Sequence, residues 1–496
     1  MRSRFIQSHF LFLASLSIAY LFSSIEISAQ TKKDSPQICP ANLSAEIAKI
    51  RQAPQLTYSR LGVVVSTLSQ PPQILVNLDG DKYFIPASNG KLFVTAAALK
   101  LFKPSDRIRT SLLSIDPPTA NGEIGGGLYV VGRGDPSFSS KSSLRSLVSQ
   151  LVAKGVKRIN GGLIPLGQFH GSGLGDGWEW QDLQEDYAAI SSPFSIDENV
   201  IDWTINPSKI NQHVKFTWDS PTLAAGWQIQ NQATTGKIDS AFTLEVNRPL
   251  GQKQLIITGS MPENAQPELG ATAVPDPEAH FLRLLADEIT KQGIRIDLST
   301  TPLADLKQGS QPQVELAVVT SPPISDLVKI TNKTSNNFYA ESLLRILGTR
   351  FNRSDRDASH TGIQVVTDTL HQQGISANSF LLADGSGLSR KNSIAPIAIV
   401  QLLRIMSVDR TFWDSMSIAG VDGTLKNRFK DTPAEANLRG KTGNLSGVAA
   451  LSGYIKPANF DRLAFSIAIN NSNQSGKELR QYIDSIVLLL NRLRHC

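Results

Sequence analysis

The order in which strand and helix patterns follow one another is the feature that most restricts the fold of this chain. Apolar runs typical of strands occupy residues 61–67 and 74–76, and from Leu92 the apolar residues recur at helical spacing. Strand patterns return at residues 447–455 and 463–469, before an amphipathic helix expected over residues 476–494. This order predicts an α/β domain made of two sequence segments, with one sheet formed by early and late strands.

The stretch between these two segments has a different pattern. From about residue 104 to 275, short strand-like runs alternate with turns rich in Gly, Pro and Asp, and helical spacing returns at residues 277–292. A chain of 496 residues exceeds what one hydrophobic core normally organises. We therefore expect a domain formed by residues 40–103 and 276–496, interrupted by a β-rich insertion of residues 104–275 that is itself the size of a domain.

The first 29 residues have the pattern of a secretory signal. Two arginines precede an apolar run at residues 10–22, and small residues surround Ala29. The run is short for a membrane span and is followed by a polar stretch, so we expect cleavage after Ala29 and export of the mature chain. An uncleaved anchor is the alternative, because Glu26 and Ile27 make an imperfect cleavage site.

Only two cysteines occur, Cys39 near the expected mature N-terminus and Cys496 at the end of the chain. Export would place them in an oxidising compartment, where a disulfide between the two ends is chemically allowed. Two unpaired thiols are the alternative, since the sequence does not show whether the residues meet.

Composition and charge give no support to several classes of function. The formal net charge of +6 comes from 49 basic and 43 acidic residues, and no run of five Lys or Arg occurs, so we expect no nucleic-acid partner. The seven histidines are scattered and form no zinc-ligand cluster. We expect neither a metal nor an organic cofactor.

Ser88 and Lys91 form the only Ser-x-x-Lys sequence in the chain. A serine hydroxyl needs a neighbouring base to act as a nucleophile. On the first turn of a helix, residues i and i+3 share a face, which places Lys91 beside Ser88 and near backbone N–H groups that can hold an oxyanion. The alternative is an ordinary helix start with a solvated lysine.

Two further short motifs complete a recognisable set. Residues 335–337 are Ser-Asn-Asn and lie between two helical segments, where the first and third side chains can project into a cleft. Residues 441–443 are Lys-Thr-Gly and open an apolar run, which predicts an edge strand with a cation, a hydroxyl and a glycine that lets a ligand approach closely. Similar sequences at residues 376–378 and 360–362 make each motif a weak signal when taken alone.

The order S-x-x-K, S-x-N, K-T-G ahead of a final strand and helix is more specific than any one motif. With this set the chain resembles the D-alanyl-D-alanine carboxypeptidase/endopeptidases of the low-molecular-mass class C penicillin-binding proteins, from about Leu61 to the C-terminus. The 247 positions between Ser88 and Ser335 correspond to an insertion that β-lactamases lack. The resemblance implies an α/β (α+β) fold of the penicillin-binding-protein/β-lactamase-like transpeptidase type, in two segments with a large β-rich insertion.

Other segments also resemble this family, and their alternative interpretation is turn chemistry. They are residues 132–136, 178–180, 384–390 and 420–425. For residues 384–390, contact with substrate and support of the site both stay open.

The resemblance implies a catalytic role for three residues. Ser88 would attack the peptide carbonyl between two D-alanines and form an acyl-enzyme, and Lys91 would accept its proton. Ser335 would relay a proton towards the leaving amine.

It also implies that substrate is bound by residues 337 and 441–444. Asn337 would hold Lys91 and the substrate amide, Lys441 would supply a positive field, and Thr442 would bind the terminal carboxylate. Gly443 would permit close approach, and the backbone N–H groups of Ser88 and Asn444 would form an oxyanion hole.

The function implied is that of an exported, periplasmic serine-type D-Ala-D-Ala carboxypeptidase that acts on peptidoglycan stem peptides and is acylated by β-lactams. Endopeptidase action on cross-links and peripheral association with the membrane stay open. One alternative, a β-lactamase-like hydrolase, would need a glutamate to activate water, and neither Glu341 nor Glu435 has the expected Leu-Asn context. The other, a non-catalytic wall-binding protein of the same fold, is opposed by the intact motifs.

Overall fold

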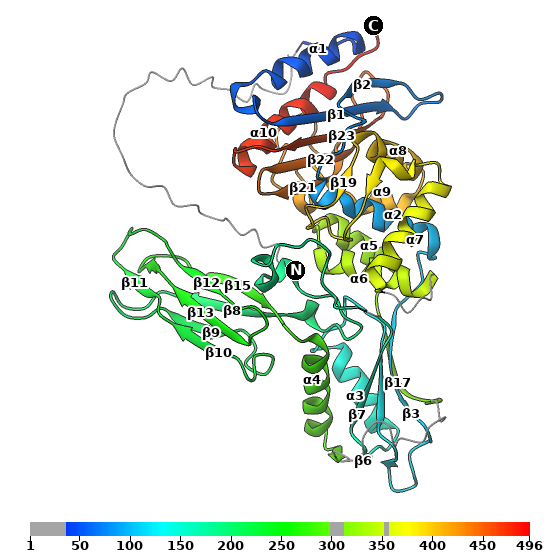
Figure 1. The fold of residues 1–496 in the computed structure, drawn as a ribbon, viewed down its shortest axis with the longest axis vertical. Coiled ribbons are helices and arrows are strands. Elements are labelled where there is room, and N and C mark those ends of the chain that lie inside the picture. Colours follow the sequence, from blue (N-terminus) through cyan, green and yellow to red (C-terminus); the bar gives the residue numbers. More distant parts are fainter. Residues whose placement is uncertain (1–35, 170, 298–311, 352–356) are drawn as a thin grey trace.

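A six-stranded sheet built from both ends of the chain forms the centre of the upper part of the molecule (Figure 1). The computed structural model describes residues 36–169, 171–297, 312–351 and 357–496. The strand order is β2-β1-β23-β22-β21-β20, and all neighbours are antiparallel. The strands are β1 (Arg60–Thr67), β2 (Ile74–Leu78), β20 (Ser417–Ile418), β21 (Arg439–Leu445), β22 (Val448–Ile455) and β23 (Leu463–Asn470). This confirms the expected sheet of early and late strands.

Helices cover both faces of this sheet, which explains why its central strands have nearly continuous apolar sequences. Every residue of β22 and β23 is buried. Helices α1 (Pro40–Arg51) and α10 (Gly476–Leu490) share one core with the sheet, and a larger group of helices shares a second core on the opposite face. That group consists of α2 (Lys91–Leu101), α5 (Ile324–Lys333), α6 (Asn337–Phe351), α7 (Ala358–Gln372), α8 (Pro396–Met406) and α9 (Arg410–Ser415).

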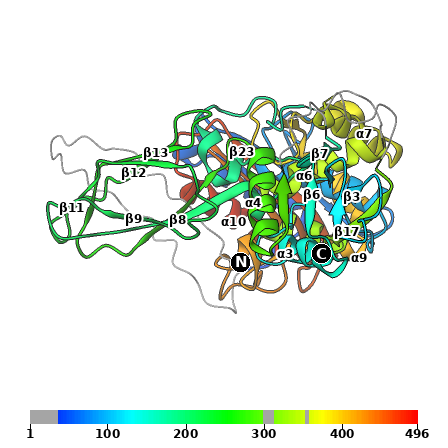
Figure 2. The same ribbon diagram turned by 90° about the horizontal axis from the view of Figure 1, so that it is seen from below.

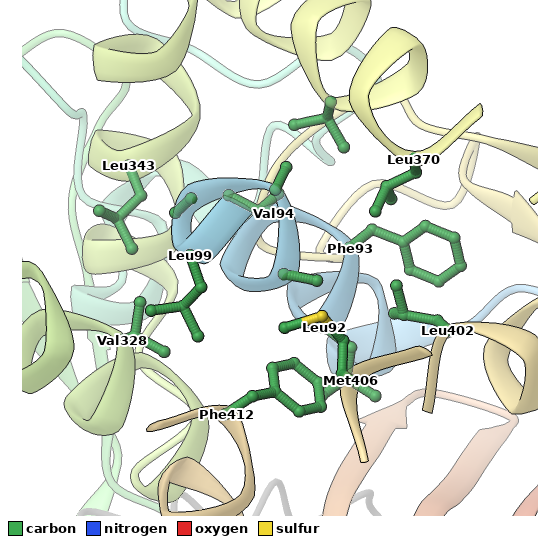
Figure 3. Close-up of a cluster of buried hydrophobic side chains, with 14 of the residues drawn as sticks. Leu92, Phe93, Val94, Leu99, Val328, Leu343, Leu370, Leu402, Met406 and Phe412 are labelled. Atoms are coloured by element: carbon green, nitrogen blue, oxygen red, sulfur yellow. The ribbon is translucent and has the colours of Figure 1, made fainter. Parts of the chain in front are cut away.

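Helix α2 lies in the middle of the second group (Figure 3). Its residues 91–98 are all buried, and no polar face remains on it apart from its ends. Side chains from α5 to α9 surround it, among them Val328, Leu343, Leu370 and Phe412. Full burial of each large apolar side chain contributes about 1.5–3 kcal/mol, so the position of the helix is firmly fixed. The start of α2 is therefore a rigid place for a reactive group.

The segment between α2 and α5 forms two further bodies below and beside the sheet (Figures 1 and 2). The first contains β3 (Arg109–Ser114), β4 (Glu123–Ile124), β5 (Leu128–Gly132), α3 (Ser143–Ala153), β6 (Arg158–Asn160), β7 (Leu163–Gly167), α4 (Pro277–Lys291), β16 (Arg295–Asp297) and β17 (Val314–Thr320). Strand β17 pairs with β3, and α4 shares a core with α3. We therefore propose that the inserted part continues to Thr320, beyond the expected boundary at residue 275.

The second body is an elongated β lobe that extends away from the rest (Figure 2). It contains β8 (Val200–Asn206), β9 (Lys215–Trp218), β10 (Gln228–Asn231), β11 (Thr234–Gly236), β12 (Glu245–Asn247), β13 (Gln254–Thr258), β14 (Ser260–Pro262) and β15 (Glu268–Ala273). Its apolar core is centred on Trp203, Leu255 and Ile257. A small hairpin of β18 (Phe380–Leu381) and β19 (Ser393–Ile394) lies in the helical group.

The two ends of the described chain meet beside α1 and α10. A disulfide joins Cys39 to Cys496, and a β-bridge pairs Ile38 with Leu493. The expected signal sequence lies outside the described residues. Within the described ranges, none of the helices is both long and apolar enough to cross a membrane.

Candidate active site

Ser88 and Lys91 lie where a short helical turn passes into the buried helix. Ser88 belongs to the 3₁₀ turn η2 (Ala87–Gly90), and Lys91 is the first residue of α2. The Lys91 Nζ atom lies 2.8 Å from Ser88 Oγ. Lys91 is fully buried, whereas Ser88 is half-buried. The predicted pair is thus in direct contact, and its lysine is not the solvated residue of the alternative interpretation.

Two acceptors besides Ser88 surround the Lys91 amine. Asn337 Oδ1 lies 2.6 Å from Nζ, and the Ser386 carbonyl oxygen also accepts a hydrogen bond from it. The Asn337 side chain is oriented by its Nδ2, which donates to the Tyr187 carbonyl oxygen at 2.8 Å. A neutral amine has two hydrogens and one lone pair. It can donate to these two acceptors while its lone pair faces the Ser88 hydroxyl.

Burial makes the neutral form of this amine accessible near pH 7. Loss of hydration lowers the pKa of Lys91 from 10.5 to about 7, although the negative charges of Asp384 and Glu341 oppose the shift. A lysine with such a pKa can accept a proton from serine and return it later.

Ser335 approaches from the turn between α5 and α6. Its φ of 59° lies in the left-handed region, which is uncommon for a residue with a side chain and is frequent at functional sites. Lys441 Nζ donates to Ser335 Oγ at 2.7 Å and to the Thr442 carbonyl oxygen at 2.9 Å. Lys441 is fully buried, and burial followed by the charge of Lys91 lowers its pKa well below 10.5. The second and third motifs are therefore joined by a hydrogen bond.

The sequence predicted that β21 lies at the edge of the sheet, but this is true of only part of the strand. The short strand β20 pairs with it, but only at Arg439 and Gly440. From Lys441 onwards, that side of β21 faces the serine residues instead of another strand. The Thr442 hydroxyl donates to Thr424 at 2.8 Å, and Asn444 is exposed.

Gly443 faces the backbone of the nucleophile segment. A Cβ built on Gly443 would lie 2.7 Å from the Pro86 carbonyl oxygen and 3.2 Å from the Ser88 nitrogen. The sequence predicted that Gly443 permits close approach of a ligand; in the structure, the backbone of the Ser88 turn approaches it. The glycine lets β21 lie directly against the turn that carries Ser88.

Residues 384–390 form a loop that contacts the Ser88 turn and the Lys91 amine. The buried Asp384 carboxylate accepts hydrogen bonds from Gly387 N, Ser389 N, Ser386 Oγ, Asn392 Nδ2 and Trp178 Nε1. Gly387 has a φ of +80°, and a Cβ there would lie 1.9 Å from the Ala87 carbonyl oxygen. Between the two interpretations left open for this loop, these contacts favour support of η2 and of the Lys91 amine.

Glu341 is a member of the site that the sequence did not reveal as such. It is fully buried on α6, one helical turn after Asn337, and its Oε1 accepts from the backbone N–H groups of Gly385 and Ser386. Burial and the nearby Asp384 raise its pKa to about 7. Its isolated position in the sequence gave no signal for this contact. Because Ser386 also binds Lys91, Glu341 holds one of the groups that orient the amine.

The inserted part contacts the site at several points. Besides the Tyr187 carbonyl at Asn337, Trp178 binds Asp384, and the carboxylate of Glu179 pairs with Arg390 at 2.8 Å. In contrast, residues 132–136 lead from the end of β5 into a turn in which Asp135 Oδ1 accepts from Ser137 N, as turn chemistry predicts. The insertion is thus part of the wall of the site.

Comparison with known proteins identifies the group to which this arrangement belongs. The sequence profile of the D-Ala-D-Ala carboxypeptidase 3 (S13) family matches residues 43–493. The chain belongs to this family. The match confirms the predicted family and enzyme class, so the protein is a serine-type D-Ala-D-Ala carboxypeptidase.

Relatives of the S13 family resemble the chain over most of their length. A D-alanyl-D-alanine carboxypeptidase of Actinomadura sp. (strain R39) is 31% identical over 464 residues, which cover 90% of this chain and 84% of the relative. The carboxypeptidase DacB of Haemophilus influenzae is 30% identical over a match that covers 83% of this chain and 85% of the relative. The crystal structure of penicillin binding protein 4 from H. influenzae superposes with a TM-score of 0.78 at 26% identity, covering 90% of this chain and 99% of that one. The predicted fold class is confirmed by this similarity.

Proposed function

We propose that this S13 enzyme removes the terminal D-alanine of peptidoglycan stem peptides through an acyl-enzyme on Ser88. The observation that carries the proposal is the contact of Ser88 Oγ with the buried Lys91 amine at 2.8 Å. Lys91 accepts the hydroxyl proton as Ser88 Oγ attacks the carbonyl between the two D-alanines. Its low pKa and its two fixed acceptors support this role.

The oxyanion of the tetrahedral intermediate is held by the backbone N–H groups of Ser88 and Asn444. The close approach of Gly443 to the Ser88 nitrogen supports this pairing, because Asn444 follows directly on the strand. Each donor of this kind contributes about 3 kcal/mol to the transition state.

Collapse of the intermediate breaks the C–N bond and releases D-alanine. Ser335 relays the proton to the leaving amine, supported by its hydrogen bond with the buried Lys441. Thr442 binds the terminal carboxylate, and Asn337 holds Lys91 and the substrate amide. Water then hydrolyses the ester on Ser88.

β-Lactams acylate the same serine and release it slowly in this proposal. Two relatives point in this direction by name: a penicillin-sensitive carboxypeptidase A of Dictyostelium discoideum, 29% identical, and the H. influenzae protein, which has also been crystallised with a β-lactam. Rapid hydrolysis is disfavoured because neither Glu341 nor Glu435 has the Leu-Asn context of the glutamate that activates water in β-lactamases. Export to the periplasm with cleavage after Ala29, peripheral association with the membrane and endopeptidase action are further parts of the proposal.

A labelled penicillin tests the nucleophile. The wild type and Ser376→Ala, which alters the exposed Ser-x-Asn at residues 376–378, should form a stable adduct, and Ser88→Ala should form none while keeping its circular dichroism spectrum. Adduct formation by Ser88→Ala would overturn the assignment. Mass analysis of purified wall peptides after incubation would then separate loss of a terminal D-alanine from cleavage of cross-links.

A further inference from the structure

A chain of hydroxyl groups runs from β21 to the C-terminal end of α5. The Thr442 hydroxyl donates to Thr424 Oγ1 at 2.8 Å, and Thr424 Oγ1 lies 3.3 Å from Ser417 Oγ. Ser417 Oγ in turn donates to the Lys333 carbonyl oxygen at 3.1 Å. Thr424 and Thr442 are both half-buried, so the chain reaches the surface of the cleft at one end.

The short turn η8 (Gly423–Leu425) holds Thr424 in this place. Gly423 has a φ of 57°, and a Cβ there would lie 2.3 Å from Ser417 Oγ and 2.5 Å from the Lys333 carbonyl oxygen. Leu425 on the other side is fully buried. The turn therefore lies directly on the end of α5, and a glycine is needed for this contact.

The acceptor at the far end fixes the direction of the Ser417 hydroxyl, and the contacts observed then give the direction of the other two. A carbonyl oxygen only accepts, so Ser417 must donate to Lys333 and its own oxygen must accept from Thr424. The Thr424 oxygen then accepts from Thr442. In this state the Thr442 proton points away from any ligand, and only its lone pairs are left for the cleft, which is unfavourable towards a carboxylate.

Rotation of the Thr424 hydroxyl reverses the direction of its hydrogen bond with Thr442. If its O–H turns from Ser417 to the Thr442 oxygen, Thr442 is free to donate to a ligand. The rotation breaks only the long contact of 3.3 Å between Thr424 Oγ1 and Ser417 Oγ. Ser417 keeps its hydrogen bond to the Lys333 carbonyl oxygen and still accepts from the Thr424 backbone N–H at 3.2 Å. A hydroxyl that accepts a hydrogen bond is polarised into a stronger donor.

We propose that Thr424 is a positioning residue for recognition of the free carboxylate at the end of the substrate, acting through the hydroxyl of Thr442. The inference rests on the proposed carboxylate role of Thr442. Thr424 itself touches neither the scissile bond nor the nucleophile; it determines whether Thr442 presents a proton or a lone pair. Its effect is therefore on the preference between substrates with and without the carboxylate.

The test uses a matched pair of D-alanyl thioesters whose leaving group carries a carboxylate or its methyl ester. The measured quantity is the ratio of kcat/KM for the acid to kcat/KM for the ester. Thr424→Val should lower this ratio about three- to tenfold, whereas Thr424→Ser, which keeps the rotating hydroxyl, should retain the wild-type ratio. Thr432→Val is the matched control, since Thr432 is a half-buried threonine in the same connection whose hydroxyl donates to the Phe429 carbonyl oxygen and accepts from the Ala434 N–H, both within that connection.

Failure of this inference can be distinguished from failure of the proposed function. Thr442→Val should lower the ratio by itself, and adding Thr424→Val to it should then have no further effect on the ratio. If Thr442→Val lowers the ratio but Thr424→Val does not, or if Thr424→Ser behaves as Thr424→Val, the role of Thr424 is refuted and that of Thr442 stands. If Thr442→Val leaves the ratio unchanged, the carboxylate role itself is refuted.

Discussion

Replacement of Gly443 by alanine tests how closely β21 must approach the nucleophile. The added Cβ would lie 2.7 Å from the Pro86 carbonyl oxygen, whereas ordinary contacts begin at 3.4 Å, so one of the two must move by about 0.7 Å, the difference between these distances. The Pro86 oxygen and the Ser88 nitrogen are backbone atoms, and the Ala87 Cβ at 3.1 Å is attached directly to that backbone, so none of the three can rotate away. A displacement of about 1 Å in an active site costs roughly a hundredfold in rate, and we expect acylation of Ser88 to slow about ten- to a hundredfold. The overpacking should also lower the free energy of unfolding by about 1–3 kcal/mol.

The assay is the second-order rate constant of acylation by a fluorescent penicillin, with urea unfolding in parallel. Gly440→Ala is the matched control on the same strand, because the nearest atom to its Cβ is the end of the Leu451 side chain at 3.0 Å, which can shift. This control should acylate within about twofold of the wild type. Acylation of Gly443→Ala at the wild-type rate, or an equal loss in both variants, would refute the reasoning.

Three further outcomes follow from the buried groups and the disulfide. Because burial lowers the pKa of Lys91 to about 7, the acylation rate should rise as pH increases from about 6 to 8 and the amine loses its proton; a flat profile would contradict this. Glu341→Gln removes the negative charge that Glu341 carries above its raised pKa of about 7 and that favours the protonated amine, so the same profile should move lower by up to about half a unit, whereas Glu288→Gln should leave it in place. Cys39→Ser or Cys496→Ser should lower the free energy of unfolding in urea by about 2–5 kcal/mol with little change in acylation, since Cys39 directly precedes α1, which packs on the opposite face of the sheet from α2; an unchanged midpoint would exclude a stabilising role.

The sequence was most informative where one periodicity governs a whole element. The sequence predicted the two-segment domain correctly from the continuous apolar runs of β22 and β23 and the helical spacing after Leu92. Strands and helices that are buried on all sides need such apolar sequences, so these patterns are easy to recognise. The short strands of the β lobe were harder to predict. Three-residue strands such as β12 (Glu245–Asn247), which pairs with β13, depend on their partners more than on their own sequence.

The motif order predicted which side chains meet, and the structure brings Ser88, Lys91 and Asn337 together, with Ser335 and Lys441 in a second hydrogen bond. Contacts through backbone atoms could not be predicted in the same way. The Tyr187 carbonyl that orients Asn337 and the Ser386 carbonyl that binds Lys91 would be present with any residue at those positions, so they leave no signature in the sequence. These two carbonyl groups reach the site only when the insertion and the loop of residues 384–390 have folded.

The pairing of β1 with β23 determines when the active site can form during synthesis of the chain. Arg60 is in register with Asn470, so the strand that leads towards the nucleophile turn has one neighbour close in sequence, β2, and the other, β23, at the far end of the described chain. Such distant pairings form slowly and late. A nascent chain that lacks β20 to β23 has only the paired strands β1 and β2 of this sheet, and it has no β21 to place against the Ser88 turn. Hydrolytic activity therefore requires a chain that is complete through β23, and a shorter nascent chain is inactive.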